Sequence, residues 1–427
     1  MAEATARRRS DVPRRSRGHH PLRRTRREWA ARIILALVVA VIGYAAVTRS
    51  MAQVLRTTAP DAAHRLAPED GRVTARLAAS VVDLQAPASG RSLAERLARA
   101  ALLSDPLAVQ AAATLGIEAQ RRGDVSRARR LFGYAERVSR REVQTQLWAI
   151  EDAVARGDIS GALRHYDIAL RTTPSTSEVL YPVLGSAIAE PAVLNALAAV
   201  LRKGPLWRDD FTSYLATNGA DPRATARMFA ALDRSGASVD PEAQAGLVNS
   251  LVARGDGAGA WTYYASIRRG VDRRRSRDPH FSAGLAHPSS FDWTQNNDAD
   301  LGTSIQRGER GGVVDFAVPA GRGGPLLQQV QWLPPGRYRL DGHSAGISQR
   351  PGALPYWSLS CLKGLEVGRV DVPNSNENGG VFSGTFTVPA GCPLQALVLN
   401  VRPSDAAAGV SGQIDRAALT PLGGGEE

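Results

Sequence analysis

The apolar residues of this chain follow three successive patterns. The first is an unbroken apolar run, IILALVVAVIGYAAV, over residues 33–47. From about 51 to 277, apolar residues recur every three or four positions, which predicts amphipathic helices. From about 278 they alternate with polar residues in short stretches between Gly and Pro, which predicts β-strands. The patterns together predict a multidomain α+β protein with one apolar helix, a helical region and a β region.

The apolar run predicts a transmembrane helix over 29–48. Its fifteen uncharged residues span only about 22 Å, short of a hydrocarbon core of about 30 Å. Twenty residues suffice if Arg32 extends to the headgroups. The ten arginines before Trp29 favour a cytoplasmic N-terminus, which makes 1–28 a basic cytoplasmic tail and sends the bulk of the chain across the membrane. A cleaved signal peptide is the alternative.

Composition and charge change this picture little. With 427 residues, 43% apolar and 22% charged, the chain is long enough for two or three domains. The net charge is +12, but 1–32 alone holds eleven arginines and three acids. The basic balance therefore belongs mainly to the tail, and we expect no nucleic-acid partner. Lys203 and Lys363 are the only lysines among 53 basic residues, which is typical of a GC-rich bacterial genome.

A short motif recurs in the helical region. Arg-Gly-Asp is followed four residues later by an alanine, and four residues after that by an aromatic residue. The glycine tolerates the positive φ that ends one helix, and the aspartate caps the next. The alanine lets two helices approach, and the aromatic ring fills the gap between repeats. These packing residues are Gly123, Ala128 and Phe132; Gly157, Ala162 and Tyr166; and Gly255, Ala260 and Tyr264.

The first two copies start 34 residues apart, and the pattern resembles the tetratricopeptide repeat. Leu115-Gly116 in the first copy and Pro174 in the second occupy positions that the family uses. The chain departs from the family pattern in that no Trp opens either copy and Arg140 replaces the closing proline of the first. The resemblance implies a helical-repeat domain over 51–271 that binds a protein partner on its concave face.

The β region predicts a sandwich or jelly roll over 285–421. An arginine-rich stretch, 272–284, is expected as a solvated linker before it, and 422–427 as a flexible tail. The candidate strands are Val313–Val318, Leu327–Trp332, Gly336–Ala345, Tyr356–Leu362, Val381–Val388, Gln395–Val401 and Gly412–Leu419.

The order of landmarks in this region resembles the galactose-binding-like jelly rolls, which include many carbohydrate-binding modules. Phe291-Asp292-Trp293 opens the region, Leu333–Leu340 has the Pro-Gly, Tyr, apolar entry to a central strand, and Gln413–Leu419 resembles the final strand. The resemblance implies an antiparallel β-sandwich and a possible polysaccharide ligand.

The chain has two cysteines, Cys361 and Cys392, both in the β region. A disulfide between them would close a loop of about 30 residues and contribute roughly 3–4 kcal/mol. Such a bridge fits an oxidising compartment. Two unlinked buried thiols are the alternative.

Polar loops and one outward aromatic residue form the candidate glycan site. If Trp357 faces the core, Tyr356 faces outward. The loop that follows Val372-Pro373 offers Asn374, Asn376, Glu377 and Asn378. A second polar loop covers Gln295–Asp298, and Asn-rich segments are also common in turns. Asp298 and Asp300 lack the spacing of a calcium loop, and we expect no metal or cofactor.

Nothing in the sequence predicts catalysis. No HExxH, GxSxG, P-loop or GxGxxG context occurs. Adjacent Asp209 and Asp210 would point about 100° apart on a helix and would not converge on one atom. We therefore expect no enzyme, although an acid–base pair from separate segments would escape this reasoning.

The expectation is a single-pass protein of the bacterial inner membrane with its bulk in the periplasm. It would be a non-enzymatic scaffold or adaptor in exopolysaccharide or cell-envelope assembly. One alternative is a pure protein-binding scaffold of a secretion or division complex. The other is a polysaccharide-modifying enzyme.

Overall fold

The computed structural model describes residues 26–82, 88–296, 301–308, 311–362, 364 and 366–422, with the side chains of 88–92 left out. The expected basic tail up to residue 25, the candidate loop residues Asn297, Asp298 and Asp300, and the end of the chain from 423 lie outside the described residues. The chain divides into two compact units, Met1–Thr145 and Gln146–Glu427.

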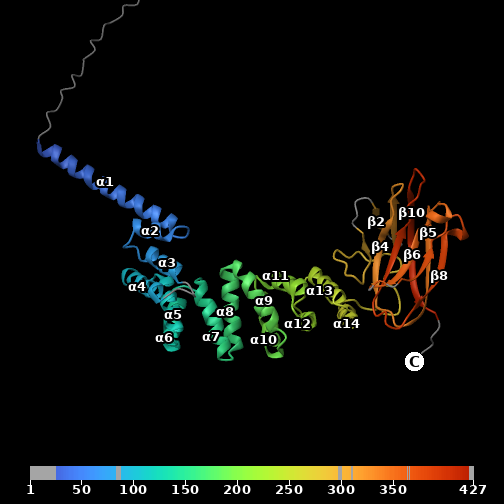
Figure 1. Cartoon of the computed structure of the whole chain (residues 1–427), viewed down its shortest axis with the longest axis horizontal. Coiled ribbons are helices and arrows are strands. Elements are labelled where there is room, and N and C mark those ends of the chain that lie inside the picture. The colour runs from blue at the N-terminus through green and yellow to red at the C-terminus, as the bar shows by residue number, and fades with distance from the viewer. Residues whose placement is uncertain are drawn as a thin grey trace, which may run out of the picture. The chain divides into compact units, whose positions relative to one another are not determined.

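Fourteen α-helices precede the strands in the described part of the chain (Figure 1). Those that lie wholly in the first unit are α1 (Arg26–Leu55), α2 (Pro60–Leu66), α3 (Gly71–Val81), α4 (Ala88–Ser104), α5 (Val109–Arg121) and α6 (Val125–Val138). Helix α7 (Val143–Ala155) starts at the boundary. The second unit continues with α8 (Ile159–Thr172), α9 (Ser177–Ala187), α10 (Pro191–Leu201), α11 (Arg208–Asn218), α12 (Pro222–Arg234), α13 (Pro241–Ala253) and α14 (Gly257–Ile267).

Helix α1 carries the apolar run. It is 30 residues long and apolar enough to cross a membrane, the one helix in the described ranges that is, and a signal sequence near the N-terminus has the same character. Its apolar segment is not covered by the rest of the chain. Ala52, near its end, is buried against Ala63, Ala67 and Val73, so the last turns of α1 belong to the first unit's core.

The repeated motif stands at the turns between paired helices. Gly123, Gly157 and Gly255 have φ values of +76°, +69° and +77°, the left-handed region that glycine enters without strain. The aspartates that follow them accept hydrogen bonds from the backbone of the next helix: Asp124 from Arg127, Asp158 from Gly161 and Asp256 from Gly259. The residues of the motif that are buried are Ala128, Phe132, Ala162, Tyr166, Ala260 and Tyr264.

Two five-stranded antiparallel sheets form the sandwich (Figure 1). One sheet has the order β1 (Thr294–Gln295), β4 (Gly324–Gln331), β9 (Gln395–Val401), β6 (Tyr356–Cys361) and β7 (Glu366–Asp371). The other has the order β2 (Gly302–Gly308), β3 (Gly311–Val318), β10 (Val410–Pro421), β5 (Gly336–Ala345) and β8 (Val381–Val388). Alternating side chains from both sheets, such as Phe316, Trp357 and Leu399, fill the core between them.

The strands agree closely with the alternation in the sequence. The observed bounds of β5, β8 and β9 equal the expected ones; β3 and β6 differ by one or two residues at one end, and β4 and β10 by one to three residues at both ends. The strands that the alternation did not predict are β1, β2 and β7. All three are edge strands, and their side chains are mostly half-buried or exposed.

The arginine-rich stretch 272–284 is solvated only in its first part, because Asp272 and Arg273–Arg275 are exposed. Ser276 and Arg277 are buried, and Ser276 exchanges hydrogen bonds with Leu419 of β10. Phe291, Val330 and Leu394 of the sandwich share one apolar cluster with Trp261 and Tyr264 of α14. The helices of the second unit and the sandwich are therefore joined by a common core, and the expectation of a solvated linker is corrected for the part that starts at Ser276.

Candidate functional site

The buried Arg277 sits where α14 meets the sandwich. Its guanidinium donates to the backbone oxygens of Phe291 (2.5 Å) and Val330 and to Gln331 Oε1 (3.2 Å). Its Cζ also lies 5.4 Å from the ring centre of Trp261 and 5.3 Å from that of Phe291. Burial lowers the pKa of Arg277 to about 10, so it remains charged at neutral pH.

A buried carboxylate lies close to this cation. Asp292 accepts hydrogen bonds from the Tyr264 hydroxyl (2.6 Å) and from the backbone and hydroxyl of Ser289 (2.9 and 2.7 Å). Burial, with the charge of Asp292, raises the pKa of Tyr264. Every polar atom here has a structural partner, so this cluster holds the joint together and offers no group to a ligand.

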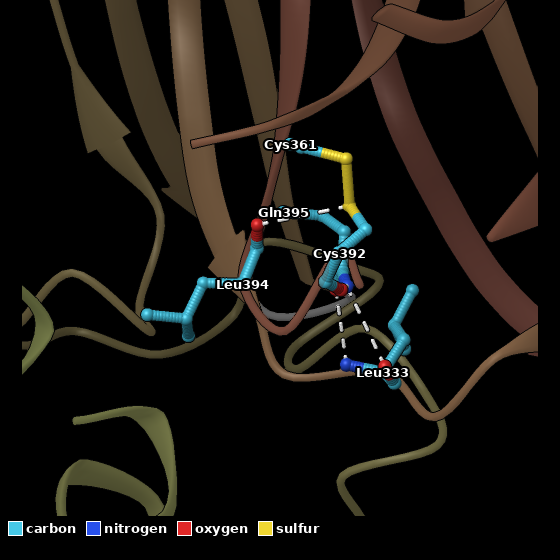
Figure 2. Close-up of a disulfide and its surroundings, with 5 residues drawn as sticks. All are labelled: Leu333, Cys361, Cys392, Leu394 and Gln395. Atoms are coloured by element: carbon cyan, nitrogen blue, oxygen red, sulfur yellow. Dashed lines mark hydrogen bonds between the residues drawn. A yellow bond between two sulfur atoms is a disulfide. The ribbon is translucent and has the colours of Figure 1, made fainter. Parts of the chain in front are cut away.

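The disulfide forms as expected. Cys361, at the end of β6, is bonded to Cys392, and their Cα atoms are 5.5 Å apart. Figure 2 shows the bond beside Gln395, whose amide donates to Cys392 O and whose Oε1 accepts from the Leu333 backbone (3.0 Å). The bridge therefore fixes the loop before β9 and stands among structural contacts.

Tyr356 lies on the outer face of its sheet, half-buried. Two guanidinium groups lie over its ring, with the Cζ atoms of Arg402 and Arg369 at 4.3 and 4.9 Å from the ring centre. Arg402 also pairs with Asp371 (2.7 Å), and Arg369 with Glu366 (2.6 Å). Cations, not open solvent, therefore cover the aromatic platform predicted for a sugar.

Part of the predicted polar loop is used to brace its own backbone. Asn374 Oδ1 accepts from the Gln349 backbone (2.7 Å), and its amide donates to Glu377 Oε1 (3.2 Å). Ser375 exchanges hydrogen bonds with the backbone of Ile347. These contacts tie the loop between β7 and β8 to the segment that follows β5.

The turn of this loop depends on left-handed backbone. Asn378, Gly379 and Gly380 have φ values of +50°, +63° and +80°. A Cβ on Gly380 would lie 2.1 Å from the backbone oxygen of Ser344, so only glycine fits there. The sharp turn keeps Asn376 and Asn378 at the surface.

A hollow of about 570 Å³ opens beside this turn. His343, Ser344, Ile347, Ser348 and Asn376 are among the residues that line it. Within the described ranges, the Asn376 amide and the Ser348 hydroxyl have no hydrogen-bond partner, and both residues are exposed. They are the polar groups of the hollow that remain available to a ligand.

His343 has both ring nitrogens engaged. Nδ1 lies 2.9 Å from both carboxylate oxygens of Asp415, and Nε2 lies 3.0 Å from the backbone oxygen of Gly379. Both neighbours are acceptors, so each contact is a hydrogen bond when the ring nitrogen that faces it carries a proton. In this arrangement the imidazole braces the turn and has no free nitrogen to act as a base.

The predicted site residues therefore lie in two separate places. Asn374, Asn376, Glu377 and Asn378 share one turn, whereas the contacts of Tyr356 are with Arg369 and Arg402 on the sheet face. The sequence reasoning assigned no role in a site to Ser348, His343 or Asp415. The alternation of β5 could have placed His343 on an outer face, but the partner Asp415 stands 72 residues away, beside a β-bulge that shifts its register.

A second surface of interest lies on the helices of the second unit. Val179 and Val183, one turn apart on α9, are 65% and 57% exposed. Helix α9 contacts α11, and α11 contacts α13. Each of these three helices is the first of a helical pair, so together they form one row. These two exposed valines give α9 a small apolar surface.

No family model matches the chain, and the comparison with curated proteins finds no relative. Among solved structures, the enzymatically active domain of tailspike protein 4 from bacteriophage CBA120 is 14% identical, with 30% of this chain covered and a TM-score of 0.21. The TmCBM61 carbohydrate-binding module, in complex with beta-1,4-galactotriose, is 16% identical, covering 36% of this chain and 99% of its own, with a TM-score of 0.24. The Gap123 complex of Streptococcus agalactiae, a glycosylation-associated protein, is 13% identical over 30% of this chain, with a TM-score of 0.21.

This chain spans only 19% of the length of the tailspike domain and 42% of the Streptococcus agalactiae chain. At these identities and TM-scores the similarities assign neither a family nor a function to the chain.

Proposed function

We propose that the chain is a membrane-anchored, non-enzymatic adaptor of exopolysaccharide or cell-envelope assembly, in which the β-sandwich binds glycan and the helices bind a protein partner. The observation that carries the glycan part is the braced hollow beside the β7–β8 turn, where Asn376 and Ser348 have no partner in the described part of the chain. The backbone beside both groups is braced, so sugar hydroxyls that bond to the amide and the hydroxyl would have only these side chains to order.

The membrane part of the proposal rests on α1 and on the arginines before it. An uncleaved α1 would cross the inner membrane with its basic N-terminus in the cytoplasm. Both units would then lie on the periplasmic side. The disulfide of the sandwich supports that side, because such bonds persist in oxidising compartments.

Recognition, not turnover, is proposed for the hollow. A general base needs a nitrogen or oxygen within reach of the substrate proton. The imidazole of His343 is held by Asp415 on one side and Gly379 on the other. The polar groups left to a ligand are an amide and a hydroxyl, which bind sugars without reacting with them.

Binding of a soluble polysaccharide panel (a β-glucan, a galactan and a uronan) to the purified full chain tests the glycan claim. We expect saturable binding of at least one polymer, and loss of about 10-fold or more in affinity for the double variant Asn376→Ala/Ser348→Ala. Ser304→Ala/Gln306→Ala, on the exposed edge strand β2, is the matched control and should bind as the native chain does.

Two outcomes would contradict this proposal. Absence of binding to all three polymers would remove the glycan role, and equal losses in both double variants would remove the hollow as its site. Tyr356→Ala separates the sheet face from the hollow: loss of binding in that variant alone would place the sugar on the aromatic ring. Shortened oligosaccharides after prolonged incubation would instead favour a polysaccharide-modifying enzyme.

A pure protein-binding scaffold is the second candidate, and the exposed valines of α9 favour it. A photo-crosslinking residue at position 179 in the full chain, in native membranes, should trap one partner. The matched position 227 lies exposed on α12 and should trap none. Trapping at 179 with no glycan binding would support the scaffold, and equal labelling at both positions would refute a specific helical surface.

A further inference from the structure

We propose that the first unit has a second binding site, a basic pocket near the end of α1 that takes the phosphate of an anionic lipid headgroup. The pocket has a volume of about 710 Å³. Four arginines line it, from three different segments: Arg56 after α1, Arg72 and Arg76 on α3, and Arg141 before α7. The inference rests on the proposed membrane anchor.

Most of this positive charge is uncompensated. Arg72 pairs with Asp105 (3.0 Å). In the described part of the chain, the guanidinium groups of Arg56, Arg76 and Arg141 have no acidic partner, and Arg76 Nε is buried without any hydrogen bond. A buried donor left unpaired costs free energy, and an anion in the pocket would supply the missing acceptor.

Among the described residues that line the pocket there is one acid, and it is hydrogen-bonded to the start of α7. Glu142 Oε2 accepts from the backbone and the hydroxyl of Thr145 (2.6 and 2.7 Å) at the start of α7. Arg72 and Arg76 also stand four residues apart on one face of α3, a like-charge spacing that disfavours the helix by itself. The four arginines that line the pocket therefore outnumber the two acids beside them, Asp105 and Glu142.

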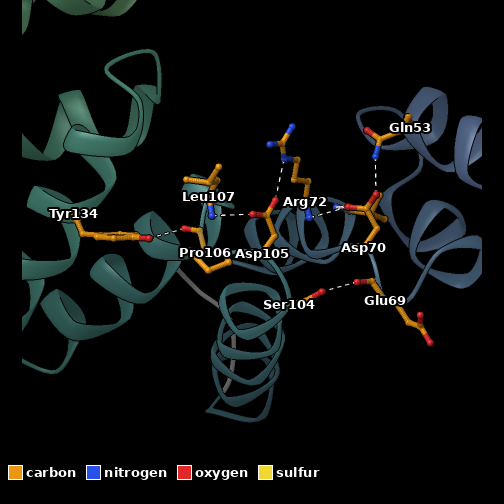
Figure 3. Close-up of polar contacts among 10 residues, drawn as sticks. Gln53, Glu69, Asp70, Arg72, Ser104, Asp105, Pro106, Leu107 and Tyr134 are labelled. Carbon is orange, nitrogen blue, oxygen red and sulfur yellow. Dashed lines mark hydrogen bonds and ion pairs between the residues drawn. The ribbon is translucent and has the colours of Figure 1, made fainter.

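The walls of the pocket are held by a chain of polar contacts (Figure 3). Gln53 of α1 donates to Asp70, Asp70 caps the first turn of α3, and Arg72 donates to Asp105 (3.0 Å). Ser104 donates to the Glu69 backbone oxygen, and Tyr134 of α6 to that of Pro106 (both 2.6 Å). These contacts brace the end of α1 and the start of α3, so the segments that carry Arg56, Arg72 and Arg76 are preorganised for an anion.

The position of the pocket along the chain indicates the source of that anion. The expected transmembrane helix ends at Thr48, and Arg56 follows eight residues later, about 12 Å along a helix. Headgroup layers extend roughly 5–8 Å beyond each side of the hydrocarbon core. Arg49 lies two helical turns before Arg56 on the same face. A line of cations would thus run from the membrane edge to the pocket.

The rim of the pocket is apolar on one side, which also fits a lipid. Leu107 lines the pocket and is 59% exposed, and Val109 and Val143 line it too. An acidic peptide or a soluble anion would gain nothing from these groups, whereas the glycerol and upper acyl carbons of a lipid would contact them. A phosphate-bearing lipid is therefore the occupant that both the charge and the rim favour.

Calorimetric titration of the full chain in nonionic-detergent micelles tests the site, with dihexanoyl phosphatidylglycerol, dihexanoyl phosphatidylcholine and inorganic phosphate as probes. We expect saturable binding of phosphatidylglycerol that is stronger than that of either other probe. The triple variant Arg56→Gln/Arg76→Gln/Arg141→Gln should bind it about 100-fold more weakly, since each arginine near a membrane surface contributes roughly a fivefold factor. The control Arg127→Gln/Arg130→Gln/Arg137→Gln removes the same charge from α6 and should change the affinity less than twofold.

Arg141→Glu is a second variant. Because Arg141 is exposed, the substitution should change the stability of the fold little, and it should abolish saturable binding. Equal binding of inorganic phosphate would assign the pocket to a soluble anion and overturn the lipid source. Equal losses in both triple variants, or no binding of any probe, would overturn the site. The intact mass of the membrane-extracted chain keeps the two proposals apart: a chain cleaved within α1 refutes the anchor, whereas an intact chain without lipid binding refutes only the pocket.

Discussion

The helices and the sandwich of the second unit are stabilised over different distances along the chain. Consecutive helices such as α11 and α12 or α13 and α14 contact each other, and the Gly-Asp turn before α8 or α14 is complete within a few residues. In the sandwich, β10 pairs with β3 and β5, whose residues lie 68 or more positions away. A substitution that removes a local contact should therefore lower the free energy of unfolding by a small amount. A substitution that removes a long-range contact should lower it by a large amount.

Arg277 provides the largest expected effect. Arg277→Met leaves the carbonyls of Phe291 and Val330 without their donor inside the joint, and should lower the free energy of unfolding of the second unit by about 3–5 kcal/mol. Chemical denaturation of the full chain, followed by tryptophan fluorescence, measures it. Arg275→Met, at a largely exposed neighbour, should change it by less than about 0.5 kcal/mol. Equal effects would mean that the joint is solvated after all.

The disulfide comes next. Cys361→Ser/Cys392→Ser should lower the stability of the sandwich by roughly 3–4 kcal/mol, because the bond closes a long loop in the unfolded chain. The loss should appear in protection of β6 and β9 from hydrogen exchange and leave α5 and α6 unchanged. A loss of protection in those helices would contradict the separation into two compact units.

A local contact in the first unit should cost less. A Cβ on Gly116 would meet the Phe132 ring at 2.7 Å, so Gly116→Ala should destabilise the α5–α6 pair by about 1–3 kcal/mol. Gly133→Ala in α6 is the control: its Cβ would meet only the end of Arg137 at 3.7 Å, and it should stabilise the helix by about 0.5–1 kcal/mol. Hydrogen exchange in α5 and α6 distinguishes the two variants.

The smallest effect is expected at a repeat cap. Asp256→Ala removes the cap of α14 and should cost about 1 kcal/mol at neutral pH. The hydrogen bond from Arg223 holds the pKa of Asp256 below its usual 3.8. The carboxylate therefore contributes stability above about pH 3.8 and loses it as the pH falls. Denaturation at pH 7 and pH 3 should show the difference between variant and native chain shrinking in acid. A difference that stays constant would show that the charge is not involved.

The same contrast of distances explains what the sequence could predict. A turn such as Gly157-Asp158 is predicted from the Gly-Asp pair alone, and central strands such as β5 and β9 are predicted from the alternation of apolar and polar residues within each strand. The edge strands β2 and β7 have few buried side chains, so they show almost no alternation. The burial of Arg277 could not be predicted, because nothing within ten residues shows that Phe291 and Val330 will surround it.

The candidate sites follow the same rule. The composition of the sequence indicates the Asn-rich turn, but it does not indicate which of the asparagines are hydrogen-bonded within the loop. Asn374 braces the loop and Asn376 remains available, since Gln349 reaches one and not the other. The basic pocket combines Arg56, Arg76 and Arg141 from segments up to 85 residues apart, and no spacing in the sequence indicates that they meet.

The most direct test of the central claim is made in intact spheroplasts of the native host, with protease and a thiol-alkylating reagent added outside. If α1 anchors the chain and exposes both units to the periplasm, the protease will remove everything beyond α1. A short membrane-bound N-terminal fragment will remain, and Cys361 and Cys392 will resist alkylation until reduced. Recovery of a protected, full-length chain in the soluble fraction, with both cysteines alkylated once the cells are broken, would contradict the account.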